Sequence, residues 1–294
     1  MYLNLKYHIA SLVAVFLAMG LGILIGSALP GDDVLAVHQQ QLAGKLEAKM
    51  YTLSQKNNSL QSKVNLLETE NNIKSQFENQ VLPALVFQKL KGRSISIIAT
   101  SGNDMTEGLL KTLTLAGAEV KSINLLNFSA VRDEDELLKI LNWPSEDKTK
   151  IIEKLSHEVS KSIVEGHTEN IKKLEDENIV KVNGYYGVYL SDVILLGGSH
   201  EKGNQKARKI DSSIAKYFKE RGINVYGIEE SGVFYSYMNE YQKMGLTTVD
   251  NIDTIAGQVA LVYAISGKPG HYGIKPTAKR LLPVMDYGVE VIVR

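Results

Sequence analysis

The sequence predicts an α/β protein with an N-terminal transmembrane helix, a coiled-coil stalk, and a mainly parallel-sheet, three-layer domain with a helical insertion. Three observations support this. An apolar run without charged residues covers Ile9–Leu29, leucines then recur every seven residues, and beyond Pro83 short apolar runs alternate with helical patterns. We therefore divide the chain into an anchor (1–31), a stalk (32–82), an extracytoplasmic α/β domain (83–266, insertion at about 129–190) and a C-terminal arm (267–294).

The apolar run Ile9–Leu29 has the length of a membrane span, since an α-helix needs about 20 apolar residues to cross the hydrocarbon core. Lys6 precedes the run, whereas Asp32 and Asp33 follow it. Positive charge stays on the cytoplasmic side, so we expect a single-pass protein of the cell membrane with a cytoplasmic N-terminus. A cleaved secretory signal is the alternative, but the run is longer than the roughly 7 to 15 apolar residues of a signal core.

Small residues repeat every four positions along this run and end in a GxxxG step formed by Gly22 and Gly26. Such a ridge lets two helix backbones approach closely in lipid. Ala and Gly are also common in membrane helices that do not pair, so the pattern leaves both alternatives open. We assign Gly22 and Gly26 to a candidate dimer interface.

The segment Val34–Gln80 is expected to form one long helix with a seven-residue apolar repeat. Leucines occupy position d of the heptad and mixed residues occupy position a, in the series Leu46, Met50, Leu53, Asn57, Leu60, Val64, Leu67 and Asn71. Leu at d with Asn at some a positions is typical of a parallel two-stranded coiled coil, because buried amides pair across the seam. The alternative is a helix packed on its own domain, but so narrow a stripe favours the coil and hence a homodimer.

Strand and helix patterns alternate beyond Pro83, which predicts a parallel sheet. The expected strands are Ser94–Ala99, Glu119–Leu126, Val193–Leu196, Ile223–Ile228, Thr247–Val249 and an edge strand Val289–Val293. One expected helix follows the loop after Ala99 and ends near Gly117. Two more cover Asn204–Arg221 and Asp253–Ile265.

Between the second and third of these strands, Ser129–Tyr189 reads as a helical insertion. Ser145 is a plausible helix N-cap, and an apolar stripe of residues four apart follows it at Ile151, Leu155, Val159 and Ile163. The aromatic segment Asn183–Tyr189 is expected to be a loop or a short strand.

Two loops qualify as ligand sites, because ligands of open α/β sheets bind beyond the carboxyl ends of strands. Backbone N–H groups there can bind an anion at a helix N-terminus. The candidate residues are Ser101, Gly102 and Asn103 in the first loop and Gly198 and Ser199 in the second. The same residue types serve any strand-to-helix turn, and neither loop matches a phosphate-binding consensus, so both alternatives stay open.

Composition argues against several classes of function. The chain has no Cys, which excludes disulfides, thiolate catalysis and Cys-based metal sites. Its formal net charge is zero, so nucleic acid is not an implied partner. The six His are scattered without the spacing of a metal site. We therefore predict no catalytic residues, no bound metal and no cofactor.

The acidic segment Asp250-Asn251-Ile252-Asp253 precedes a predicted helix. We expect a structural or partner-binding role, in which Asn251 turns the chain and Asp253 caps the helix. The alternative is a carboxylate pair, Asp250 and Asp253, that binds a metal or performs acid–base chemistry.

Several segments resemble a known family in the same order along nearly the whole chain. They are Leu5–His8, Ser11–Ala18, Gly22–Ser27, the coil behind them, Thr248–Thr254, Gly257-Gln258 and Tyr272–Pro276. These segments are similar to the mycobacterial copper transport protein B (MctB) family. The resemblance implies a bacterial envelope protein, nominally of copper transport or copper homeostasis, with relatives linked to cell separation and control of cell-wall hydrolysis.

Two hypotheses follow for function. The first is a non-enzymatic, dimeric envelope protein whose stalk presents an α/β domain to an envelope protein partner. The second is a direct copper-binding or copper-transport protein, for which copper is expected from the family name. The residues favour the first, because the chain offers one span and no cluster of soft ligands.

Overall fold

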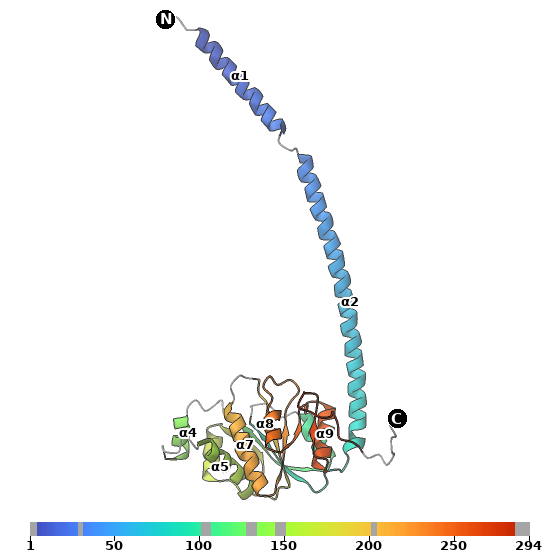
Figure 1. The fold of residues 1–294 in the computed structure, drawn as a ribbon, viewed down its shortest axis with the longest axis vertical. Coiled ribbons are helices and arrows are strands. Elements are labelled where there is room, and N and C mark those ends of the chain that lie inside the picture. The colour runs from blue at the N-terminus through green and yellow to red at the C-terminus, as the bar shows by residue number, and fades with distance from the viewer. Residues whose placement is uncertain are drawn as a thin grey trace. The chain divides into compact units, whose positions relative to one another are not determined.

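The computed structural model describes residues 5–28, 32–100, 107–127, 134–144, 151–200 and 205–285 (Figure 1). The chain divides into two compact units, Met1–Lys74 and Ser75–Arg294. The first contains α1 (Leu5–Ala28) and most of α2 (Asp32–Val86), and the second contains the end of α2 and an α/β domain. This confirms the predicted fold class.

Helix α1 is long and apolar enough to cross a membrane, as predicted. Residues 6–28 have a mean hydropathy of 2.5, and the structure buries none of this apolar stretch. Helix α2 is continuous over 55 residues. It runs past the predicted end at Gln80 and through Pro83, where one intrahelical hydrogen bond is lost. Burial of Leu82 and Val86 in the domain core offsets that loss.

The α/β domain is built on a seven-stranded sheet with the order β3-β2-β1-β4-β5-β6-β7. All neighbouring strands are parallel except the β2–β3 pair, which is antiparallel. The strands are β1 (Ser94–Ala99), β2 (Glu119–Leu126), β3 (Val180–Gly184), β4 (Asp192–Leu196), β5 (Asn224–Ile228), β6 (Thr247–Val249) and β7 (His271–Tyr272). The predicted bounds of β1 and β2 are confirmed. Along the chain, β2 and β3 are added on one side of β1, and β4 to β7 are then added on its other side. The strand order therefore reverses between β1 and β4.

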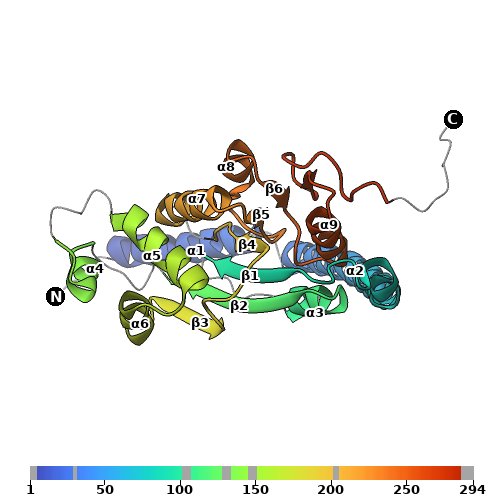
Figure 2. The same cartoon turned by 90° about the horizontal axis from the view of Figure 1, so that it is seen from below.

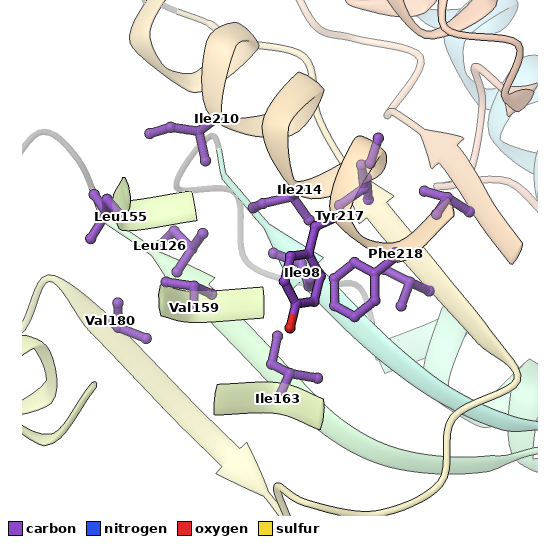
Figure 3. Packing of buried hydrophobic residues seen from close by; sticks show 14 of the residues in the cluster. Ile98, Leu126, Leu155, Val159, Ile163, Val180, Ile210, Ile214, Tyr217 and Phe218 are labelled. Carbon is purple, nitrogen blue, oxygen red and sulfur yellow. The ribbon is translucent and has the colours of Figure 1, made fainter. Parts of the chain in front are cut away.

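Helices cover both faces of the sheet, which gives the predicted three layers (Figure 2). One face is covered by α3 (Glu107–Leu115), α9 (Ile255–Ile265) and the end of α2. The other is covered by α5 (Ile151–Glu165), α7 (Gln205–Glu220) and α8 (Met238–Lys243). A buried hydrophobic cluster fills the space on each side, and Figure 3 shows Ile214 of α7 and Val159 of α5 together with Ile98 of the sheet.

The insertion is helical, as predicted, with α4 (Glu134–Leu141), α5 and α6 (Glu169–Asp176). The stripe of residues four apart on α5 is buried, at Ile151, Leu155, Val159 and Ile163. The insertion also contributes β3, which extends the sheet beyond β2. Sequence patterns did not separate this strand from the aromatic segment after it, because β3 is short and its residues 181, 183 and 184 are exposed. The expected N-cap Ser145 and the expected strand Val289–Val293 lie outside the described residues.

Candidate functional site

The two predicted ligand loops follow neighbouring strands of the sheet. Thr100 extends β1, and its backbone N–H donates to the carbonyl of Leu196, the last residue of β4, at 3.3 Å. The loops therefore leave the sheet at the point where the strand order reverses, which is where open α/β sheets bind ligands. Ser101, Gly102 and Asn103 lie outside the described residues, so the geometry concerns the second loop.

In the described part of the second loop, the backbone of Ser199 is hydrogen-bonded within the protein. The Ser199 N–H donates to the Tyr235 carbonyl at 3.0 Å, and the Tyr235 N–H donates back to Ser199 at 2.9 Å. The N–H of Ser199 is therefore not available to an anion. Gly198 has a φ of +80°, and a Cβ there would lie 2.9 Å from the Val233 side chain. Glycine at 198 thus serves a close turn, not a phosphate cradle.

Aromatic side chains near α8 fill the space above the strand ends. A Cβ at Gly197 would lie 2.1 Å from the Tyr241 hydroxyl, and one at Gly227 would lie 2.2 Å from the Tyr241 ring. Tyr237 and Tyr241 are both almost fully buried. The crevice that an open α/β sheet offers to a ligand is therefore occupied here by Tyr237 and Tyr241.

Asp211 is a buried acid at the same edge that sequence reasoning missed. It lies on α7 between the buried residues Ile210 and Ile214, and the Tyr241 hydroxyl donates to its Oδ2 at 2.6 Å. Burial raises the pKa of Asp211 to about 7, while the neighbouring hydroxyls of Thr100 and Tyr241 act in the opposite direction. The signal in the sequence was a lone acid on the apolar face of a predicted helix.

Asp250 joins two segments that are far apart in the sequence. Its carboxylate accepts the backbone N–H of Ile274 at 2.7 Å and that of Lys275 at 3.1 Å. A Cβ at Gly273, where φ is +136°, would lie 1.9 Å from Asp250 Oδ1. Asp250 therefore fixes the turn after β7 and requires glycine at 273.

Asn251 and Asp253 have structural roles, but the predicted cap at Asp253 is wrong. Thr254 is the N-cap of α9, and its hydroxyl accepts the Gly257 N–H at 3.1 Å. The extended backbone of Thr254 points its side chain at the helix end, while Asp253 accepts the Ser231 N–H at 2.7 Å. The Asn251 carbonyl accepts the Thr254 N–H at 3.0 Å, which confirms the predicted turn.

A buried ion pair that sequence reasoning also missed completes this edge. Lys275 Nζ lies 2.7 Å from Glu229 Oε1, and the Glu229 side chain is fully buried. The same carboxylate accepts the Ser236 hydroxyl at 2.6 Å and the Tyr237 N–H at 2.8 Å. Glu229 directly follows β5, as Asp250 follows β6, and that shared position was the signal available in the sequence.

The arrangement holds loops together and does not bring carboxylates to one point. Asp250 and Asp253 contact different segments, so they do not form the paired site considered above. Within the described ranges, no three His, Asp or Glu side chains gather in a way that could hold a metal ion. His157, His167 and His200 each pack against a different aromatic ring.

A protein-family comparison agrees with the resemblance noted in the sequence. The model described as copper transport outer membrane protein, MctB, matches residues 2–283. The chain belongs to the MctB family. No curated protein matches the chain. Two of the segments that carry the MctB resemblance, Thr248–Thr254 and Tyr272–Pro276, are the ones that Asp250 joins.

The MctB description relates the family to copper transport and to a membrane. Copper sites in proteins use thiolate, thioether and imidazole ligands. The chain has no Cys, and the described His residues do not converge. Among the residues that the structure describes, no cluster of three His or acidic side chains marks a copper site.

Replacing Asp250 should destabilise the domain. Asp250→Ala removes the acceptor of the Ile274 and Lys275 N–H groups, which are partly buried, and each lost hydrogen bond costs about 0.5–1.5 kcal/mol. We expect a melting temperature several degrees lower by circular dichroism, with a smaller loss for Asp250→Asn, which keeps one oxygen. A metal ion that raises the melting temperature of the parent, but not of Asp250→Ala, would instead support a carboxylate metal site.

Asp211 should make stability depend on pH near neutrality. Its folded pKa of about 7 exceeds the ordinary value of 3.8, so the folded state holds the proton more tightly. The stabilisation from this proton is complete below pH 4 and is lost as pH rises through 7, at up to about 1.4 kcal/mol per pH unit. Asp211→Asn should remove this loss, so that the variant gains stability relative to the parent between pH 5 and pH 8. Urea unfolding of both proteins at pH 5 and pH 8 measures this difference. An equal change in the free energy of unfolding of parent and variant between the two pH values would contradict the assignment.

Proposed function

We propose that this MctB-family protein is a non-enzymatic, membrane-anchored protein of the cell envelope that dimerises through a coiled-coil stalk. The stalk would present the α/β domain to an envelope protein partner. The observation that carries the proposal is an exposed apolar stripe on α2. Its leucines Leu46, Leu53, Leu60 and Leu67 are between 56% and 65% exposed, and Met50 and Val64 between them are exposed as well.

An exposed stripe of this kind calls for a partner helix. Full burial of a Leu side chain stabilises by about 1.5–3 kcal/mol, so a stripe left in water forgoes several such contributions. Asn57 and Asn71 sit among the apolar residues, and buried Asn pairs specify a two-stranded parallel register. A second copy of the same chain provides a matching stripe.

The membrane anchor supports the same arrangement. Two copies inserted with the same orientation can pair their following helices only in parallel. A Cβ added at Gly22 or Gly26 of α1 would meet nothing within 4 Å, so these positions are open, and their lack of a side chain would let another helix approach closely. Pairing of α1 and pairing of α2 are therefore compatible with one dimer.

The domain is proposed to lie outside the cytoplasm. Lys6 in the first turn of α1 and Asp32 and Asp33 after the helix support this orientation. A role in cell separation or cell-wall regulation agrees with the family resemblance. The non-enzymatic assignment is supported by the internal use of Asp250, Asp253 and Glu229 at the sheet edge.

Direct copper binding or copper transport is the second candidate, and the family description favours it. The number of copper ions bound per chain distinguishes the two candidates. A tight site with one copper per chain, measured by calorimetry on the purified protein, would favour this candidate over an interaction protein.

The dimer can be tested with single cysteines, because the chain has none of its own. Asn57→Cys, at position a, should form a disulfide-linked dimer of the full chain in membranes under mild oxidation. The control Ser62→Cys lies at position f, on the outer side of the predicted coil, and should stay monomeric on the same gel. Adding Leu53→Ala and Leu60→Ala should abolish the Asn57→Cys cross-link, since each truncation of a buried Leu costs about 2–5 kcal/mol. Equal cross-linking at positions 57 and 62 would contradict the seam.

Topology can be tested with the Ser62→Cys variant. A maleimide that does not cross the membrane should label this thiol in spheroplasts without lysis, because the stalk is proposed to lie outside. A second variant, Asn4→Cys, precedes the span and should be labelled only after lysis. The reverse pattern would invert the proposed orientation.

A further inference from the structure

A cavity of about 490 Å³ lies at the amino-terminal edge of the sheet, away from the loops described above. It is lined by the first residues of β5 and β6, such as Asn224 and Thr247, and by the turns that end α7, α8 and α9. Its volume falls within the roughly 300–1,000 Å³ of small-molecule sites. Nothing in the sequence patterns pointed to it.

Three helix ends explain why this space is hollow. Gly222, Gly245 and Gly267 follow α7, α8 and α9, and their φ angles are +72°, +70° and +114°. Each donates its N–H to a carbonyl of the last turn, as the Gly222 N–H does to Lys219 at 3.0 Å. The residue after each glycine closes a second bond to the same helix, as in a Schellman motif. A Cβ at Gly222 or Gly267 would meet nothing within 4 Å.

These bonds also decide the electrostatics of the cavity. A helix C-terminus disfavours an anion through its unsatisfied carbonyls. Here the closing turns already satisfy several of those carbonyls, so the full charges of the side chains on the wall outweigh the helix ends. Two of the residues that line the cavity are cationic, Arg93 and Lys219.

Arg93 is held in place but only loosely paired. Its Nη1 lies 3.5 Å from both oxygens of Asp192, longer than the roughly 2.7–2.9 Å of a strong charge-assisted hydrogen bond. Asp192 takes closer bonds from the Ser191 hydroxyl at 2.6 Å and from the Asn224 amide at 3.1 Å. The contact with Asp192 uses one guanidinium nitrogen, and the Arg93 side chain as a whole is 35% exposed. The paired donors that bind a carboxylate side-on therefore remain for a ligand.

Lys219 supplies a second positive charge. Its Nζ donates to the Met244 carbonyl at 2.7 Å, which holds the ammonium close to Gly245 at the cavity rim. Among the described residues, no acidic side chain forms an ion pair with Lys219. Other parts of the wall are apolar, including Ile265 and Pro269. Positive charge beside an apolar wall suits an anion with an apolar body.

We propose that this cavity binds a small amphipathic carboxylate. Arg93 and Lys219 hold the carboxylate group, and Ile265 and Pro269 contact the apolar body. Arg93 directly precedes β1 in the turn that follows α2, so the bound ligand contacts the connection between the long helix and the sheet. This site is independent of the proposed dimer.

Calorimetry on the full chain in detergent micelles tests the chemistry of the ligand with matched probes. N-acetylphenylalanine should bind, and N-acetylphenylalaninamide, which has the same body without the charge, should bind about tenfold more weakly or not at all. Phenyl phosphate separates carboxylate from phosphate recognition. Tighter binding of phenyl phosphate, equal binding of acid and amide, or no binding of the acid at millimolar concentration would overturn the proposal.

Three variants test the residues. Arg93→Lys keeps a charge beside Asp192 but loses the planar fork, and should weaken binding of the acid about tenfold. Lys219→Gln should weaken it severalfold, whereas the control Lys216→Gln changes an exposed lysine of the same helix that does not line the cavity and should bind as the parent does. Melting temperatures within a degree or two of the parent establish that each variant is folded. Binding unchanged in both Arg93→Lys and Lys219→Gln, or weakened equally by Lys216→Gln, would place the ligand elsewhere.

Discussion

Burial of β1 on both faces is the constraint on which the rest of the domain depends. Ile95 and Ile97 enter one hydrophobic cluster and Ile98 enters the other, and all three are fully buried. A parallel strand of this kind is stable only when helices cover both sides of the sheet. The last turn of α2 supplies part of one cover through Val86, so the end of the long helix belongs to the core of the domain.

The carboxyl edge of the sheet illustrates how a position typical of ligand binding can become structural. Glu229 and Asp250 are almost fully buried, and each is satisfied by groups from a distant segment of the chain. Removing Lys275 from its ion pair with Glu229 would be strongly destabilising, since the charge of Glu229 would stay buried. The polar residues at this edge thus hold the turns after β5, β6 and β7 in one arrangement, while tyrosines occupy the crevice.

The amino edge has the opposite character. Its loops are short glycine turns that leave space, and its charged groups are only partly paired, as the long contact between Arg93 and Asp192 shows. The two proposals made above rest on separate parts of the chain. The proposed dimer rests on the exposed stripe of α2, and the proposed carboxylate site rests on this edge of the sheet.

Local patterns in the sequence determined the apolar span, the seven-residue repeat and the bounds of β1 and β2. These features depend on residues close together in the chain, so local composition and spacing are enough to predict them. The sequence also identified Asn251 as a turn, but it missed Thr254 as the cap, because the side chain of Asp253 is taken by Ser231, 22 residues earlier. Only the tertiary structure decided the Glu229–Lys275 pair, the burial of Asp211 and the cavity between three helix ends. Each of these joins segments that are distant in the sequence, and their approach is set by how the helices pack on the sheet, which no local pattern encodes.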